Sequence, residues 1–167
     1  MHTKDSDGNW KYDYTVSARI GKNGIGKTRE GDGKTPTGIY TLGQAFGVAG
    51  NPGSTRGWLT LNSNHYWVDD SNSPYYNRLV DASVTGYHWS SAEHLINYKT
   101  AYKYAVAVNY NSDCIPGKGS AIFLHCSTGN ATAGCISIPE GYMIHTLQNL
   151  KPDCRIIIDY SHNIYSY

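Results

Sequence analysis

The chain has 167 residues with a formal net charge of +1, and only 16% of its residues are charged. This length suits one domain with its own core, and so weak a charge gives no field that would recruit nucleic acid or an anionic membrane. The 15 tyrosines favour half-exposed strands and the 18 glycines favour tight turns, so the composition leans toward β structure.

The first half of the chain predicts short strands between glycine-rich turns. The predicted strands are residues 10–20, 39–42, 58–62 and 65–69. Glycine-rich stretches at 21–38 and 44–57 separate them as loop or turn. The last two strands are close enough to form a hairpin around Ser63 and Asn64.

The second half combines short strands with one clear helix. The stretch 70–81 predicts mostly loop, and 90–98 predicts a short helix with Ser90 as N-cap and Glu93 three residues on. Apolar residues at helical spacing after Pro139 predict a second helix. The predicted strands are residues 104–110, 120–125, 135–138 and 155–160. Many short strands with one or two helices, in no regular alternation, indicate a mainly antiparallel fold.

The segment GKNGIGKT at 21–28 matches a phosphate-binding loop in its letters but not in its context. Such a loop needs a helix that opens at GKT and points its amides at phosphate. Two glycines and Pro36 follow Thr28 closely and prevent that helix, so we expect a turn in which Lys27 faces solvent. The strand 155–160 is then an ordinary buried strand, and no nucleotide partner is expected.

The cellular compartment is left open by the residues alone. No apolar run reaches the length of a membrane span, and the polar start MHTKDSDGNW does not resemble a signal peptide. A cytosolic protein would look like this, and so would a fragment of a longer secreted protein. A disulfide between Cys114 and Cys154 is possible in an oxidising compartment.

The segment 119–141 places a histidine and a cysteine where they can meet. An apolar strand ends at His125, a small polar loop follows, and Cys135 opens the next strand. A thiolate is a strong nucleophile, and an imidazole beside it can take the thiol proton. Gly134 leaves room for the backbone to approach a substrate, and the amides of Gly134 and Cys135 could face a developing oxyanion.

Two other interpretations compete for these residues. Cysteine is often buried as a small apolar residue, and for an arbitrary Cys–His pair this interpretation is favoured over catalysis. A zinc site through His125, Cys126 and Cys135 lacks a fourth ligand at suitable spacing, so no metal is expected. Cys126 should point away from His125, because neighbours on a strand alternate.

The segment HCSTGNATAGCISIP resembles the active-site segment of the L,D-transpeptidase catalytic domain, the YkuD family. The shared pattern is a histidine after an apolar strand, a loop, and Ser/Thr-x-Gly-Cys before an apolar residue. GDGKTPTGIY resembles the family's Thr-Pro-x-Gly strand entry, and GSAIFLH resembles the strand that leads into the histidine. YWVDDSNSPYYNRLVD and SAEHLINY resemble a subgroup with a short His-to-Cys loop.

The resemblance implies a mainly β, two-sheet, β-sandwich-like fold with one or two short helices. It implies a single catalytic domain over 1–167, as a fragment of a longer secreted or wall-associated protein. Such an enzyme is extracytoplasmic, acts on peptidoglycan stem peptides, and needs no cofactor.

Carried over to this chain, the resemblance makes Cys135 the nucleophile and His125 its base and later its acid. The backbone carbonyl of Cys126 would orient the histidine, and Gly134 with Cys135 would form the oxyanion hole. Cys135 would attack the carbonyl of the third stem residue, releasing a D-residue, and an amine would resolve the thioester into a crosslink. Resolution by water would make the protein a carboxypeptidase, and a non-catalytic wall-binding module is the remaining alternative.

The chain departs from the family pattern at two positions. A second histidine usually precedes the cysteine by two residues, where this chain has Ala133. Arg or Asn usually follows it by two residues, where this chain has Ser137, which makes Ser137 a candidate substrate-binding residue. His88 and Tyr110 are further candidates, although a surface position for His88 and packing for Tyr110 are the simpler expectations.

Overall fold

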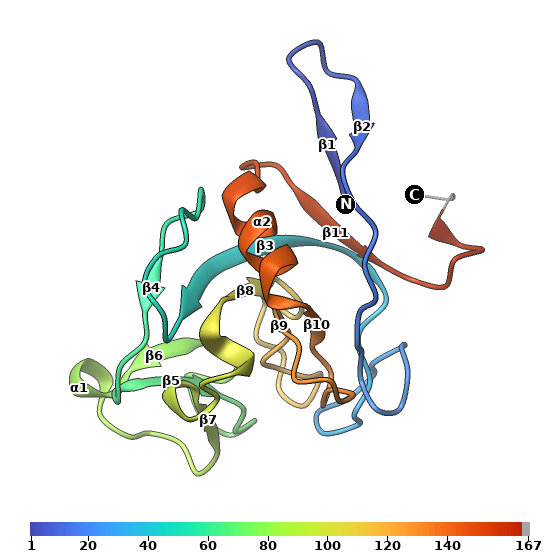
Figure 1. Ribbon diagram of the computed structural model, residues 1–167. Coiled ribbons are helices and arrows are strands. Elements are labelled where there is room, and N and C mark those ends of the chain that lie inside the picture. Colours follow the sequence, from blue (N-terminus) through green and yellow to red (C-terminus); the bar gives the residue numbers. More distant parts are fainter. Residues whose placement is uncertain (165–167) are drawn as a thin grey trace.

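The computed structural model describes residues 1–164 and shows a mainly β molecule (Figure 1). Within these residues there are three sheets, of six, three and two strands, and two short α-helices. The prediction of a mainly β fold with one or two short helices is therefore confirmed. The final three residues of the predicted domain 1–167 lie outside the described residues.

The six-stranded sheet forms the centre of the molecule. Its strand order is β10-β9-β8-β3-β11, with β4 paired to β3. The strands are β3 (Gly38–Gly47), β4 (Leu59–Thr60), β8 (Ala105–Val108), β9 (Phe123–Cys126), β10 (Ile136–Ile138) and β11 (Arg155–Ile158). β9 runs antiparallel to β8 and parallel to β10. Every residue of β8, β9 and β10 is buried, as expected for strands covered on both faces.

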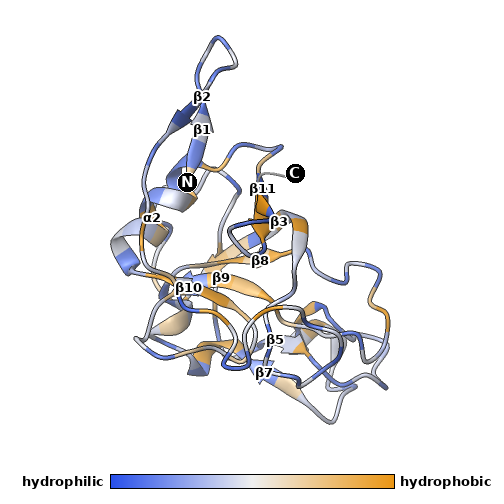
Figure 2. Ribbon diagram, turned by 90° about the vertical axis from the view of Figure 1, so that its right-hand side faces the viewer, coloured by the Kyte–Doolittle hydropathy of each residue, from blue (hydrophilic) through white to orange (hydrophobic). Residues whose placement is uncertain are grey.

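One face of the central sheet is covered by helix α2 (Glu140–Asn149). Its Met143 and Leu147 are fully buried in one apolar cluster with Leu124 of β9. Figure 1 shows α2 lying against the sheet, and Figure 2 shows hydrophobic residues concentrated in β8 and β9. The helix begins directly after Pro139, so this prediction is confirmed.

The other face is covered by the three-stranded sheet, whose order is β6-β5-β7. Its strands are β5 (His65–Val68), β6 (Leu79–Asp81) and β7 (Ala92–His94), and the short helices that follow β6 and β7 are α1 (Ala82–Thr85), η1 (Leu95–Asn97) and η2 (Ala101–Lys103). Trp67 of β5 meets Phe123 of β9 edge-on, with ring centroids 4.8 Å apart. This contact joins the small sheet to the strand that carries His125.

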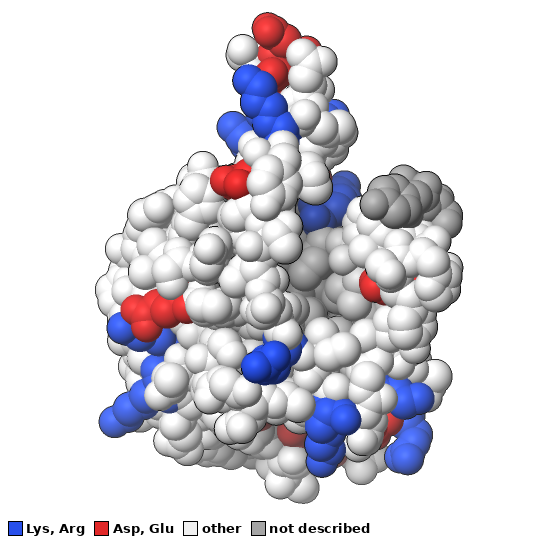
Figure 3. All heavy atoms as spheres, turned by 45° about the vertical axis from the view of Figure 1, so that its right-hand side comes forward, with Lys and Arg blue, Asp and Glu red and all other residues white. Residues whose placement is uncertain are grey.

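The third sheet is a hairpin of β1 (His2–Lys4) and β2 (Trp10–Tyr12) that projects from the rest of the molecule (Figure 1). Trp10 and Tyr12 are largely exposed on it. Figure 3 shows positive and negative side chains together on this projection and in small separate groups over the face drawn below it. This view shows no large patch of one sign, in keeping with the small net charge.

Two strand predictions in the first half are wrong. The strand predicted over 10–20 ends at Tyr12, and the rest is extended chain that makes only isolated bridges. The hairpin predicted from 58–62 and 65–69 does not form. β4 pairs with β3, whereas β5 pairs with β6 and β7, so β4 and β5 do not pair with each other.

The helix predicted over 90–98 is also wrong. β7 pairs with β5 and places Glu93 opposite Trp67, and only the short 3-10 helix η1 follows. The stretch 70–81 is mostly loop, as predicted, and only its last three residues form strand β6 (Leu79–Asp81). The remaining predicted strands are present with shifted ends, at residues 39–42, 104–110, 120–125, 135–138 and 155–160.

Candidate active site

Strands β9 and β10 bring His125 and Cys135 to one face of the central sheet. Ser137 pairs with His125 in the parallel ladder, so Cys135, two residues earlier, lies beside Phe123. Side chains alternate along a strand, so Cys135, Ser137 and His125 point to the same face. The N–H of Phe123 donates to the Cys135 sulfur at 3.3 Å, which agrees with this placement. The two predicted side chains therefore occupy neighbouring positions beneath the three-stranded sheet.

The His125 ring is oriented by the residue that follows it. Its Nδ1 lies 2.8 Å from the backbone oxygen of Cys126. A carbonyl oxygen only accepts, so Nδ1 carries the proton and donates, and the lone pair is left on Nε2. His125 is buried, and this burial lowers its pKa. The imidazole is therefore neutral near pH 7, as a base must be.

The Cys135 side chain is buried and hydrogen-bonded as a thiol. Its Sγ donates to the carbonyl oxygen of Ala121 at 3.2 Å. Burial raises the pKa of the Cys135 thiol, and the negative charge of Glu93 raises it further. The resting group is therefore an uncharged thiol rather than a thiolate.

Two threonine hydroxyls fix the backbone at the cysteine. Both donate to the carbonyl oxygen of Cys135, Thr132 at 2.6 Å and Thr35 at 3.3 Å. Thr35 is fully buried and also accepts the N–H of Gly21 at 2.8 Å. Both threonines belong to segments that carried the family resemblance, but neither was assigned a role from the sequence. The Thr35 contact joins positions a hundred residues apart, which no local pattern reveals.

Gly134 is packed more tightly than the sequence suggested. A Cβ at this position would lie 3.0 Å from the carbonyl oxygen of Lys34, so the absent side chain makes room for the chain itself. The Gly134 N–H donates to the hydroxyl of Thr132 at 3.1 Å. To take part in an oxyanion hole, this amide would have to donate to the substrate oxygen in place of the Thr132 hydroxyl. Its role there is therefore a proposal.

Tyr102 and Glu93 border the pair on the side of the small sheet. The Tyr102 ring stands edge-on to the rings of His125 and Phe123, with centroids 5.5 and 5.4 Å apart. Its hydroxyl donates to Glu93 Oε2 at 2.5 Å. Burial raises the pKa of Glu93 to about 7. Tyr102 was assigned no role from the sequence, and Glu93 was assigned to the first turn of a helix that does not form.

Cys126 points to the opposite face of the sheet, as predicted. It is 2% exposed, belongs to the apolar cluster beneath α2, and its sulfur donates to the carbonyl oxygen of Tyr104 at 3.5 Å. His125, Cys126 and Cys135 therefore do not converge on one point. Among residues 1–164 no group of three or more His, Cys, Asp or Glu side chains is arranged to hold a metal. Cys114 and Cys154 are not bonded to each other.

The three candidate substrate residues have different surroundings. Tyr110 is buried, and its hydroxyl donates to the Lys118 carbonyl at 2.8 Å, which is a packing role. His88 is exposed in the segment before β7, and its ring lies 6.2 Å from that of Tyr75 in the loop between β5 and β6. Ser137 lies beside His125 and is 1% exposed, and its Oγ has no partner in the described part of the chain. Ser137 is thus the one of the three that the strand register places next to the pair.

The segment that resembles a phosphate-binding loop holds a carboxylate of the chain itself. Asp32 accepts the N–H groups of Thr28, Arg29 and Lys34, and the Lys27 ammonium lies 2.9 Å from it. The Lys27 side chain is only 3% exposed, so the expectation that it faces solvent is wrong. The next regular element after Thr28 is strand β3, and the helix that nucleotide binding requires does not follow.

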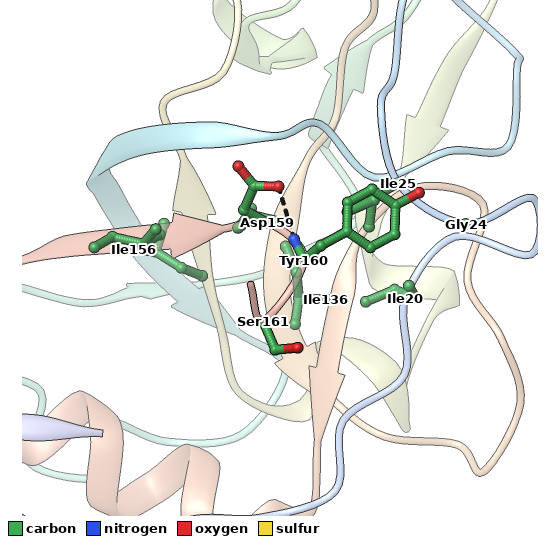
Figure 4. Close-up of a pocket in the computed structure, with 10 residues that line it drawn as sticks. Ile20, Gly24, Ile25, Ile136, Ile156, Asp159, Tyr160 and Ser161 are labelled. Carbon is green, nitrogen blue, oxygen red and sulfur yellow. Dashed lines mark hydrogen bonds between the residues drawn. The ribbon is translucent and has the colours of Figure 1, made fainter. Parts of the chain in front are cut away.

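A pocket of about 470 Å³ lies at the other side of the central sheet (Figure 4). Ile20, Ile25 and Ile136 line it together with residues 156–161. Ile136 points to the face opposite Cys135, because the two are adjacent on a strand. This pocket is therefore separate from the candidate active site.

Comparison with known proteins places the chain in a family. No helix within residues 1–164 is long and apolar enough to cross a membrane. Neither the curated proteins nor the solved structures contain a match. The family model described as the L,D-transpeptidase catalytic domain (YkuD) matches residues 5–158, which include His125 and Cys135. Because this match covers most of the chain, the protein belongs to the YkuD family of L,D-transpeptidase catalytic domains.

Proposed function

We propose that this protein is a cysteine L,D-transpeptidase with Cys135 as nucleophile and His125 as base. Its family implies a peptidoglycan enzyme of the L,D-transpeptidase type and suggests a location at the cell wall. The observation that carries the assignment is the His125 ring, which is fixed through Nδ1 by the Cys126 carbonyl on the face that also bears Cys135. That arrangement leaves Nε2 as the basic nitrogen of the site.

In the first half of the reaction the thiol attacks the carbonyl carbon of the third stem residue. The S–H proton passes to Nε2 of His125 while the C–S bond forms and the carbonyl electrons move to oxygen. The backbone N–H of Cys135, with that of Gly134, would donate to this oxyanion. When the intermediate collapses, the amide C–N bond breaks, the imidazolium gives its proton to the leaving D-residue, and a thioester remains.

In the second half an amine of a neighbouring stem attacks the thioester. The amine gives a proton to His125, the C–S bond breaks, and the sulfur recovers its proton from the imidazolium. The new amide is a crosslink. The Thr132 and Thr35 hydroxyls hold the Cys135 carbonyl throughout, so the nucleophile starts each cycle from the same position.

The assignment is tested by Cys135→Ala on purified muropeptides. We expect the variant to keep its thermal unfolding midpoint within a few degrees and to lose both D-residue release and crosslinking. Cys126→Ala is the matched control and should remain active, because that sulfur lies on the opposite face. In the wild type a carbapenem should add its mass to Cys135. Persistent turnover by Cys135→Ala, or labelling at Cys126, contradicts the proposed nucleophile.

Two alternatives remain testable. A hydrolase with the same pair would release the D-residue equally fast with or without an acceptor amine and would form no dimer. A wall-binding module with a vestigial pair is favoured by one observation, the raised pKa of the buried Cys135 thiol. That alternative requires the intact protein to bind muropeptides without converting them, whereas our proposal requires conversion.

A further inference from the structure

Three contacts connect Glu93 on the small sheet to the proposed catalytic pair on the central sheet. The Glu93 carboxylate accepts the Tyr102 hydroxyl at 2.5 Å. The Tyr102 ring, 4% exposed, stands at 83° to the His125 ring. The same ring stands at 88° to Phe123, whose N–H donates to the Cys135 sulfur. Tyr102 thus contacts the Glu93 carboxylate through its hydroxyl, and through its ring it contacts His125 and Phe123, the residue that binds the Cys135 sulfur.

Two charges near this contact act on the pKa of the Cys135 thiol in opposite directions. After burial, the carboxylate of Glu93 is the largest influence that raises the pKa of Cys135. Lys27 is the opposing cation, but its ammonium already pairs with Asp32 at 2.9 Å. A negative charge beside a sulfur opposes formation of the thiolate.

We infer that Glu93 and Tyr102 are a positioning pair for the reaction proposed above, with Tyr102 holding the His125 ring and Glu93 adding to the burial that keeps Cys135 an uncharged thiol at rest. The role of this pair in turnover rests on the proposed function, but the effect of the Glu93 charge on the Cys135 thiol does not. It follows that the S–H proton leaves during attack, to Nε2 of His125, and not beforehand. Every bond and proton in the step is then accounted for by the thiol, the imidazole and the substrate carbonyl.

Other titratable groups face Glu93 from neighbouring segments. Asp69 follows β5, and Glu30 comes from the loop before β3; both are negative and disfavour its ionisation. The phenols of Tyr98 and Tyr102 feel the Glu93 charge in return. Burial, reinforced by the negative charges of Asp69 and Glu30, raises the pKa of Glu93 to about 7. The charge beside Cys135 therefore changes within the pH range in which the enzyme can be assayed.

The test is the rate at which iodoacetamide alkylates Cys135 between pH 5.5 and 9, followed by mass spectrometry of the peptide that contains it. In the wild type the rate should rise less than tenfold per pH unit near pH 7, because ionisation of Glu93 there opposes that of the thiol. Glu93→Gln keeps an acceptor for the Tyr102 hydroxyl and removes the charge. In this variant we expect a uniform tenfold rise per unit, and a rate at pH 8 that is about tenfold that of the wild type.

Tyr102→Phe separates the effect of the Tyr102–Glu93 hydrogen bond from that of the aromatic contact with His125. It keeps the aromatic contact with His125 and removes only the donor to Glu93. The hydrogen bond from Tyr102 favours the ionised form of Glu93, so without it Glu93 ionises at higher pH. The pH range in which the alkylation rate rises less than tenfold per unit should therefore move to higher pH. This variant also keeps the inference testable in the event that Glu93→Gln does not fold.

Two controls separate charge from loosening of the fold. Glu140→Gln removes a carboxylate whose partner is the exposed Lys103, and Cys135 alkylation should be unchanged. Cys126, buried on the opposite face, is an internal monitor because it reacts faster only when the sheet opens. Identical Cys135 profiles in wild type and Glu93→Gln, or parallel gains at Cys126, overturn the inference. The assay uses no peptidoglycan, so failure of the proposed function would appear separately, as absent turnover by a wild type with the expected profile.

Discussion

At the scale of single residues, Asp32 explains why GKNGIGKT matches a phosphate-binding loop. Glycine-rich turns present successive backbone N–H groups to an anion, and a lysine adds charge. Here the anion is the chain's own carboxylate, which binds Thr28, Arg29 and Lys34 through their N–H groups and Lys27 through its ammonium. The sequence motif therefore indicates an anion-binding loop, but it does not show which anion the loop binds.

Replacing Asp32 should therefore destabilise the loop. Asp32→Asn leaves the Lys27 ammonium buried without its counter-charge, and we expect a loss of about 3 kcal/mol in the free energy of unfolding, measured by urea denaturation. Asp5→Asn is the matched control, because Asp5 also caps backbone N–H groups but in the exposed hairpin. A loss for Asp32→Asn no larger than that for Asp5→Asn would show that the buried ion pair adds nothing.

Thr35 is a second residue with an effect beyond its own position. Thr35→Val keeps the shape of the side chain but removes the hydroxyl that binds both Gly21 N–H and the Cys135 carbonyl. We expect a cost of about 1–3 kcal/mol in stability from the unpaired buried groups, and a lower kcat with little change in KM. Thr37→Val, on the exposed side of the same motif, should leave both unchanged. Equal kinetics in the two variants would remove Thr35 from the site.

At the scale of elements, the predictions succeeded where the signal is local. Helix α2 carries its own start at Pro139 and its own apolar stripe, and the strands around His125 and Cys135 are apolar runs between turns. The helix predicted over 90–98 failed because a helix cap and a strand end share the same residue types. What decides the outcome is the pairing of Glu93 with Trp67 on β5, a partner that lies outside any local window.

Helix α2 should be the main support of the face opposite the site. Leu147→Ala removes a fully buried side chain, and we expect a loss of about 2–5 kcal/mol in the free energy of unfolding. Gln148→Ala, one residue on and exposed, loses only a surface hydrogen bond to Pro52 and should change stability by less than about 1 kcal/mol. Denaturant titration of both variants compares the contribution of the buried face of α2 to the free energy of unfolding with that of its exposed face. Similar losses in the two would mean that α2 is not packed as described.

At the scale of the whole molecule, the sequence could place the proposed catalytic pair together but could not predict its surroundings. His125 and Cys135 lie within one short segment, so their motif is contiguous and its chemistry can be recognised. Thr35, Glu93 and Tyr102 reach the same place from three other segments, and no local pattern predicts their contacts around the pair. The network around the pair is a product of sheet topology, which brings separate loops together only after folding.

The same network predicts how stability depends on pH. Hydrogen bonds from Thr28 and other donors outweigh burial and hold the pKa of Asp32 below its usual range, and burial lowers the pKa of His125. Stability from both groups is present above their unfolded values and is lost as pH falls. Glu93 acts in the opposite sense, because its pKa rises from 4.5 to about 7 in the folded protein. Its stabilising contribution is complete below pH 4.5 and is lost as pH rises toward 7.

Glu93→Gln should therefore change the alkaline side of the stability curve and leave the acid side in place. The wild type loses about 3 kcal/mol between pH 4.5 and 7 through this one group, and the neutral amide does not. We expect the variant to match the wild type at pH 4.5 within about 1 kcal/mol, the usual scatter of a polar substitution. The two stabilities should then diverge with rising pH until the variant is the more stable at pH 8. Denaturant unfolding at four pH values measures this divergence. A difference that stays constant with pH would show that Glu93 is ionised throughout, and would remove the charge that the structure places beside Cys135.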